Sequence, residues 1–165
     1  MGIVKRIYMK KRGQEPKNSL KWISHPKHIK KLLLITNEEE KSLKRKCEEL
    51  FENAAVHHLF ERPIKLDNSK GFYYTVHESD FNLTGKLKND KLTNLAQMEF
   101  DLLIDLSQNS ETLDFFLKKV KSGLKVGDLS AENKNNYDFF VELNNRDVST
   151  ITLIHKQLAY LTKDE

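Results

Sequence analysis

The chain has 165 residues, the size of one domain or of one domain with a tail. Hydrophobic residues make up 38% of it, and nine Phe and five Tyr are enough to build one core, which excludes a fully disordered protein. The apolar run Leu32–Ile35 has four residues where a membrane span needs about 20, and the single cysteine, Cys47, excludes an intramolecular disulfide and a cysteine-rich zinc site.

Charge is unevenly distributed along the chain. Residues 1–36 contain ten Lys or Arg and one acid, a net charge of +9, whereas the remaining residues carry −5. This leader lacks the apolar stretch of about 7–15 residues that a signal peptide needs. We therefore expect a cytoplasmic protein, with peripheral contact to the inner face of the membrane left open.

The first expected element is a short helix over residues 3–12. Its apolar residues at positions 3, 4, 7 and 8 would share one stripe, and cations would cover the other faces. Gly13 and Pro16 end this pattern. We accordingly expect residues 1–30 to be a basic N-terminal extension and residues 31–165 to be one folded domain.

The domain is predicted to begin with a strand, a helix and a second strand. Residues 32–36 form a continuous apolar run, typical of a strand buried on both faces of a sheet. Residues 37–55 are predicted to be a helix with Asn37 as its N-cap, three glutamates in its first turn, and Cys47 on its apolar face. Residues 56–60 are the second strand.

Strands and helices continue to alternate to the end of the chain. Strands are expected at 72–77, 100–106, 124–127 and 137–143, and helices at 91–98, 110–121 and 147–161. The helix 110–121 is expected to end at Ser122-Gly123. This alternation indicates βαβ units, so the predicted class is α/β: a single Rossmann-like, mostly parallel sheet with helices on both faces, preceded by the basic extension.

Ligands of such sheets bind beyond the carboxyl ends of the strands. Those ends offer five polar residues as a candidate ligand pocket: Asn37, Asp105, Ser107, Asp128 and Asn144. The turn at residues 36–40 has no glycine and three carboxylates, which disfavours a phosphate cradle and a bound dinucleotide. We assign no catalytic residue and expect no cofactor.

No metal site is predicted from the histidines. His25 and His28 flank a proline, and the adjacent His57 and His58 would face opposite sides of a strand, so none of them has the spacing of a ligand set. Cys47 is expected to be a core residue.

Two resemblances support the predicted fold. The strand 100–106, the helix after it and the segment 124–127 (Leu-Lys-Val-Gly) resemble one Rossmann-like half of the heptosyltransferase-type glycosyltransferases, which are built from two such halves. Residues 31–161 also resemble a family of small Bacteroidota proteins of unknown function, through the strand 100–104, the turn 125–127 and the C-terminal segment 158–161. Both resemblances imply a fold, and neither supplies catalytic residues.

Three functions are consistent with these features. We favour a non-enzymatic accessory or binding protein whose extension docks on a larger protein or ribonucleoprotein assembly. The residues expected to make this contact are Lys5, Arg6, Tyr8, Lys10, Lys11, Arg12, Lys17, Lys21, Trp22, Lys27, Lys30 and Lys31. The alternatives are a peripheral membrane subunit held by the amphipathic N-terminus, and a degenerate glycosyltransferase-like or nucleotide-binding enzyme.

Overall fold

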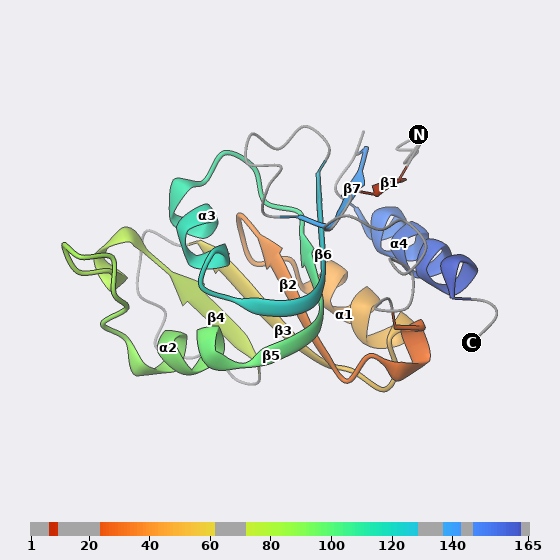
Figure 1. Ribbon diagram of the computed structural model, residues 1–165, viewed down its shortest axis with the longest axis horizontal. Helices are drawn as coiled ribbons and strands as arrows, with labels where there is room; N and C mark the ends of the chain where they lie inside the picture. Colours follow the sequence, from red (N-terminus) through yellow and green to blue (C-terminus); the bar gives the residue numbers. More distant parts are fainter. Residues whose placement is uncertain (1–6, 10–23, 62–71, 129–136, 143–146, 163–165) are drawn as a thin grey trace, which may run out of the picture.

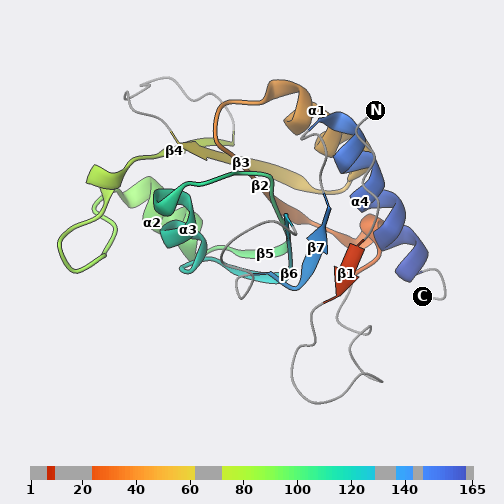
Figure 2. The ribbon, with the colours of Figure 1, turned by 90° about the horizontal axis from the view of Figure 1, so that it is seen from above.

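A seven-stranded sheet with helices on both faces forms the body of the protein (Figures 1 and 2). The computed structural model describes residues 7–9, 24–61, 72–128, 137–142 and 147–162. The strands are β1 (Ile7–Met9), β2 (Lys31–Thr36), β3 (Ala55–Glu61), β4 (Tyr73–Val76), β5 (Glu99–Asp105), β6 (Lys121–Asp128) and β7 (Phe139–Val141). This architecture confirms the predicted α/β, Rossmann-like class.

The strands lie in the order β1-β7-β6-β5-β2-β3-β4. Six of them, β2 to β7, pair in parallel, and β1 pairs antiparallel with β7 at the edge. Counted in chain order from β2 and read from the β4 edge, the parallel strands follow the order 3-2-1-4-5-6 of a doubly wound Rossmann sheet.

Two helices cover each face of the sheet. Helices α1 (Lys41–Leu50) and α4 (Val148–Leu161) pack on one face, and α2 (Asp90–Gln97) and α3 (Glu111–Leu117) on the other (Figure 2). Two short 3-10 turns, η1 (Pro26–His28) and η2 (Glu78–Asp80), precede β2 and α2. No helix in the described parts of the chain is long and apolar enough to cross a membrane.

Strand β2 lies at the centre of both cores, as its apolar run predicts. Leu32 and Leu34 pack with α1 and α4, while Leu33 and Ile35 pack with α2 and α3. All four side chains are fully buried, and each contributes about 2 kcal/mol of hydrophobic stabilisation relative to an exposed position. Cys47 is buried in the first of these cores, where burial raises the pKa of its thiol to about 12.

The predicted helix over residues 3–12 is wrong where the structure describes this segment. Residues Ile7–Met9 form a strand, in which Ile7 pairs with Val141 and Met9 with Phe139. An isolated helix of about ten residues is marginal in water, whereas the open edge of β7 offers backbone partners to an extended segment.

Two predicted helices are shorter than expected. Helix α1 starts at Lys41 with Glu40 as its N-cap, so Asn37 does not cap it. Helix α3 ends at Leu117, and Ser122, expected at its C-terminus, lies in β6 opposite Phe100 of β5. Tertiary strand pairing has overridden the local helical pattern there.

The start of β2 is tied to β5 by a carboxylate. The Asp101 Oδ2 atom accepts hydrogen bonds from the backbone N–H groups of Lys30 and Lys31, at 2.7 and 3.0 Å. The last residues of the predicted extension are therefore anchored to the sheet. The division of the chain at residue 30 stays a prediction.

Candidate functional site

The strand order reverses between β2 and β5, and this switch point is where open α/β sheets bind ligands. Strand β2 ends at Thr36 and β5 at Asp105, with Ile35 and Asp105 side by side in the ladder. The Leu106 N–H donates to the Ile35 carbonyl at 2.8 Å, which holds the two chain exits together. Side chains that leave the sheet here define the candidate site.

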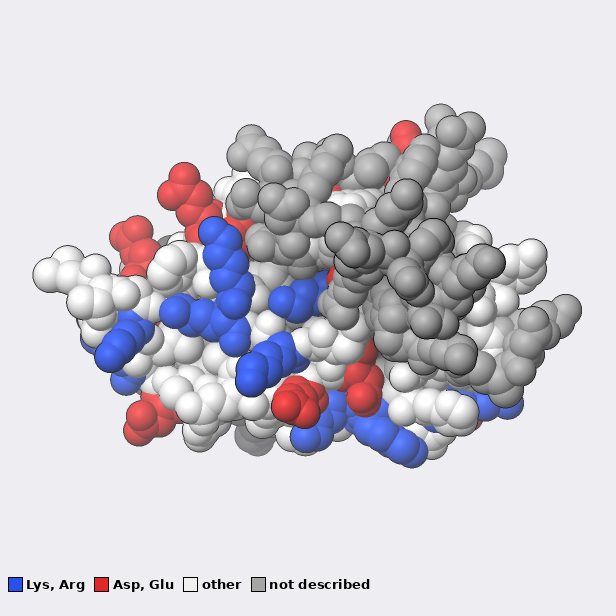
Figure 3. All heavy atoms as spheres, viewed as in Figure 1, with Lys and Arg blue, Asp and Glu red and all other residues white. Residues whose placement is uncertain are grey.

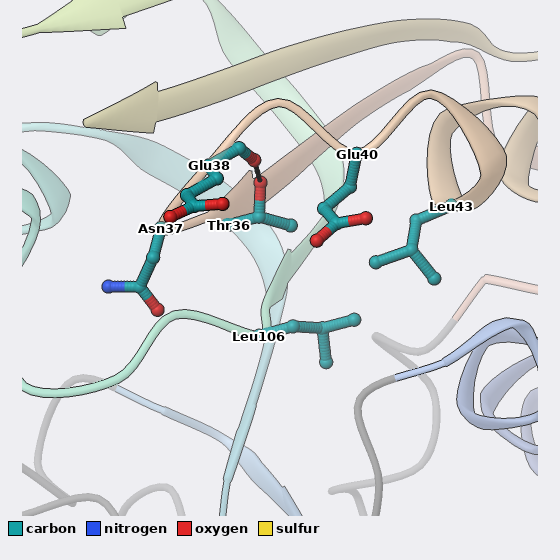
Figure 4. Close-up of a pocket in the computed structure, with 6 residues that line it drawn as sticks. All are labelled: Thr36, Asn37, Glu38, Glu40, Leu43 and Leu106. Carbon is teal, nitrogen blue, oxygen red and sulfur yellow. Dashed lines mark hydrogen bonds between the residues drawn. The ribbon is translucent and has the colours of Figure 1, made fainter. Parts of the chain in front are cut away.

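A small pocket opens at the switch point, on the side of α1 (Figure 4). Its volume is about 160 Å³, and it is lined by Thr36, Asn37, Glu38, Glu40, Leu43 and Leu106. Typical small-molecule sites measure roughly 300–1,000 Å³, and a cavity of about 150 Å³ holds benzene. The pocket is therefore large enough for a compact ligand and too small for a nucleotide.

The lining of the pocket is apolar at its base and acidic at its rim. Leu43 and Leu106 are each 3% exposed. Glu38 and Glu40 are exposed, and the Glu40 carboxylate points into the space between Thr36, Leu43 and Leu106 (Figure 4). Carboxylates in this position repel a phosphate group.

Asn37 closes one end of the pocket. Its side-chain N–H donates to the Gln108 carbonyl, and its side-chain oxygen accepts from the Gln108 N–H, both at 2.7 Å. The loop after β2 and the loop after β5 are thereby joined in one rigid lip. Asn37 lines the pocket, and there it acts as a clamp and not as a helix cap.

His58 of β3 lies directly behind the pocket, in contact with Thr36. Its Nε2 atom is 2.7 Å from the Thr36 Oγ1 atom, and the Thr36 hydroxyl donates its proton to the Glu38 carbonyl. Thr36 therefore accepts from His58, which fixes the Nε2–H tautomer and leaves Nδ1 unprotonated. In the described structure Nδ1 is buried without a hydrogen-bond partner.

A second proton on His58 would have no acceptor in this environment. Burial, followed by the nearby charge of Lys44, lowers the pKa of His58 from 6.5 to about 4. The imidazole is consequently neutral at physiological pH and supports the wall of the pocket through Thr36.

On the other side of the switch point a carboxylate is enclosed by side chains. Asp105 is 2% exposed. Its Oδ1 atom accepts hydrogen bonds from the N–H and the hydroxyl of Ser107, at 2.9 and 2.5 Å, and its Oδ2 atom accepts one from the Tyr137 hydroxyl. Burial raises the pKa of Asp105, and these hydrogen bonds oppose that rise.

Tyr137 covers Asp105 because Gly127 leaves room for its ring. A Cβ atom at Gly127 would lie 2.5 Å from both Cγ and Cδ1 of Tyr137, so no other residue fits without displacing the ring. Burial first, and then the charge of Asp105, raises the pKa of Tyr137, so its hydroxyl stays a proton donor.

The predicted pocket residues fall into separate places. Asp105 accepts hydrogen bonds from Ser107 and Tyr137, and the charge of the buried Asp128 helps to raise the pKa of Tyr137. Asn37 lines the open pocket, and Asn144 lies outside the described residues.

Sequence reasoning missed two kinds of residue at the site. Thr36, Glu38, Glu40 and Leu43 lie beside Asn37 in the chain, and the sequence analysis considered the glutamates only as first-turn acids of a helix and as a barrier to phosphate. His58, Leu106 and Tyr137 reach the site from distant parts of the chain, so no local spacing marks them.

The remaining histidine of β3 is part of the aromatic core. His57 faces the opposite side of the strand from His58, as expected, and its Nδ1 atom is 3.1 Å from the Tyr74 hydroxyl. Its ring packs against Phe72 and Phe100, at 4.4 and 5.5 Å between centroids. Within the described ranges no three His, Cys, Asp or Glu side chains are grouped closely enough to hold a metal ion.

Few of the predicted contact residues of the extension can be placed. Lys27, Lys30 and Lys31 are exposed around the start of β2, and Tyr8 is described only as part of the backbone of β1. The others lie outside the described residues: Lys5, Arg6, Lys10, Lys11, Arg12, Lys17, Lys21 and Trp22.

Comparison with known proteins identifies a family but no activity. No curated protein and no solved structure matches the chain. A family of unknown function, DUF6913, matches residues 3–163, which include both the basic leader and the sheet. The chain, from its edge strand to its last helix, is therefore a member of the DUF6913 family.

Proposed function

We propose that this chain is a non-enzymatic accessory or binding protein that docks through its basic extension, residues 1–30, on a larger ribonucleoprotein assembly. The observation that carries this proposal is the separation of charge, +9 in residues 1–36 against −5 in the rest of the chain. Clustered lysines neutralise phosphates without reading bases, which suits contact with an RNA backbone.

The edge strand β1 supports this proposal. It lies inside the basic segment and pairs with β7, so the chain around it starts from a defined position on the body. Lys10, Lys11 and Arg12 follow this strand directly in the sequence. A segment anchored at such a point loses less conformational freedom on docking than one attached only at residue 31.

The test is binding of a labelled single-stranded RNA, measured by fluorescence anisotropy as a function of salt. In the triple variant Lys10→Gln/Lys11→Gln/Arg12→Gln, we expect the slope of log K against log salt concentration to become shallower by about 2, because about 0.7 counterion is released per phosphate neutralised. The affinity at low salt should fall in parallel.

A matched variant controls for net charge. Lys41→Gln/Arg45→Gln/Lys156→Gln removes three exposed cations from α1 and α4 and should leave the slope unchanged. An equal loss in both variants would contradict docking through the extension. Salt-dependent binding to anionic vesicles in place of RNA would assign the extension to a membrane surface instead.

The second candidate is a degenerate glycosyltransferase-like or nucleotide-binding enzyme, whose ligand would bind at the switch point. It rests on the resemblance to half of a heptosyltransferase-type enzyme, whereas the resemblance to a Bacteroidota family leaves the activity open. A thermal-shift screen with nucleotides and nucleotide sugars tests it. Stabilisation by one compound, lost in Glu40→Ala, would support an enzyme, and the small acidic pocket leads us to expect none.

A further inference from the structure

A loop at one end of the molecule carries an apolar side chain at its apex. Phe81 and Leu87 form an antiparallel bridge at the base of this loop, and Leu83 between them is 109% exposed. Figure 1 shows the loop projecting at the left, at the opposite end from α4. A single exposed leucine is ordinary on a protein surface, so the meaning of Leu83 depends on how it is held and on what surrounds it.

The loop is rigid. The Asn82 Oδ1 atom accepts three hydrogen bonds, from the N–H and the hydroxyl of Thr84 at 2.9 and 2.7 Å and from the Lys86 N–H at 2.9 Å. The Asn82 N–H donates to the Lys86 carbonyl at 2.9 Å, and Gly85 adopts a φ of 78°, which only glycine takes easily. Leu83 is therefore presented to solvent by a built turn.

The loop rests on α3, next to a second exposed apolar side chain. A Cβ atom at Gly85 would lie 2.7 Å from Phe115 Cζ, and the rings of Phe81 and Phe115 meet edge to face at 5.0 Å between centroids. Phe115 is itself 42% exposed, and the Lys119 Nζ atom lies 5.0 Å from its ring centre. The loop that carries Leu83 thus packs on α3 through Phe81 and Gly85.

Lysines surround these apolar groups. Residues 81–89 contain two lysines and no acid, and residues 115–121 contain three lysines and no acid. All five are exposed: Lys86, Lys88, Lys118, Lys119 and Lys121. Figure 3 shows basic side chains gathered over α3 and the strand that follows it.

Four acids flank these two segments. The Asp80 carboxylate accepts a hydrogen bond from the His77 N–H, and Asp90 begins α2, beyond the loop. Asp114 directly precedes Phe115 in α3, and Glu99 of β5 lies opposite Lys121.

We propose that the loop 81–88 and the segment 115–119 form a docking surface for an anionic lipid bilayer. Leu83 enters the interfacial layer, Phe115 lies at the headgroup boundary, and Lys86, Lys88 and Lys119 contact lipid phosphates. A lipid surface fits better than RNA because a protruding aliphatic side chain finds an apolar phase in a bilayer, whereas RNA offers aromatic bases for stacking. This surface uses no residue of the extension, so it is independent of the proposed RNA contact.

Co-sedimentation of the full chain with vesicles tests the surface. On phosphatidylcholine vesicles with about 30% phosphatidylserine, we expect Lys86→Gln/Lys88→Gln/Lys119→Gln to lower the partition coefficient about 100-fold, or about fivefold for each lysine. Leu83→Ser should lower it at least about tenfold, since the side chain is exposed and the fold does not need it.

Two variants provide matched controls. Tyr160, 73% exposed on α4, is changed in Tyr160→Ser, and Lys41→Gln/Arg45→Gln/Lys156→Gln removes three cations from the opposite face of the sheet. Both should bind the vesicles like the unchanged protein. Equal losses in test and control variants would overturn the proposal.

A fluorescent label separates this surface from the extension. In Leu83→Cys an environment-sensitive thiol dye reacts at residue 83, because Cys47 is fully buried. We expect its emission to shift to shorter wavelength on anionic vesicles, and that of Tyr160→Cys to stay unchanged. An unshifted dye at residue 83 on bound protein would show that the extension alone binds and would overturn the proposal. Binding of RNA through the same lysines, without vesicle binding, would overturn it as well.

Discussion

Carboxylates on the two sides of the β2–β5 switch point differ in their exposure to solvent. On the α1 side, Glu38 and Glu40 stand in solvent at the rim of a pocket. On the α3 side, Asp105 is buried and saturated with hydrogen bonds from Ser107 and Tyr137. A ligand could bind at the switch point on either side of the sheet, and the packing of the side chains determines which side is accessible.

The difference shows which polar groups can meet a ligand. A buried carboxylate whose oxygens already accept three hydrogen bonds has little capacity left for a substrate, and the bonds of Asp105 instead join the end of β5 to Ser107 and Tyr137. The exposed glutamates keep that capacity. Sequence position at a strand end is therefore insufficient evidence for a functional carboxylate.

The largest expected effect is a loss of stability at low pH caused by His58. His58, behind the open pocket, has a pKa lowered from 6.5 to about 4, so the unfolded state binds its proton first as the pH falls. Its contribution to stability is complete above pH 6.5 and is lost as the pH falls toward 4, up to about 3 kcal/mol. Urea unfolding at a series of pH values measures this loss.

The variant His58→Gln keeps a donor for Thr36 and cannot titrate in this range. We expect its free energy of unfolding to depend less steeply on pH between 6.5 and 4. An unchanged slope would mean that other groups govern the acid sensitivity. Asp105 acts in the opposite direction, because a raised carboxyl pKa favours the folded state at low pH.

Displacement of the Tyr137 ring, on the α3 side of the switch point, should destabilise the fold. Gly127→Ala places a methyl group 2.5 Å from Tyr137 Cγ and should lower the free energy of unfolding by about 2 kcal/mol through overpacking. In a Tyr137→Ala background the same substitution should cost little. A double-mutant cycle with no coupling between the two positions would refute the contact.

Removing the Tyr137 hydroxyl tests its hydrogen bond to Asp105. Tyr137→Phe keeps the ring and leaves the Asp105 Oδ2 atom without this donor, which should cost about 1.5 kcal/mol. Tyr160→Phe, at an exposed position, is the matched control and should be neutral. Equal stability of Tyr137→Phe and the unchanged protein would show that the hydroxyl does not support the carboxylate.

The smallest effect is expected on the open side. Glu40→Gln changes an exposed side chain without an ion pair among the described residues, so the free energy of unfolding should change by no more than about 0.5 kcal/mol. Chemical denaturation measures it. A loss of stability as large as that of Tyr137→Phe would mean that Glu40 supports the fold. The carboxylates on the two sides of the switch point would then not differ in their structural role.

Local sequence patterns correctly predicted the elements that do not depend on a partner from a distant part of the chain. The apolar run of β2 and the helix predicted over residues 147–161, found as α4 (Val148–Leu161), are such cases. The opposite orientations of His57 and His58 follow from strand alternation alone.

Local patterns failed where a partner from a distant part of the chain decides. Strand β1 exists because β7 pairs with it, and Asn37 bonds to Gln108, 71 residues away, in place of a helix N-terminus. The pocket and the Tyr137 cover depend on the strand order, which brings β2, β5 and β6 together. No spacing within one segment encodes that order.

The antiparallel pairing of β1 has a consequence for solubility. Strand β7 reads Phe-Phe-Val, and an open strand of this composition is a template for pairing with another molecule. Ile7–Met9 occupy that template within the same chain. Deleting β1 would thus expose the unpaired backbone of β7 and favour self-association.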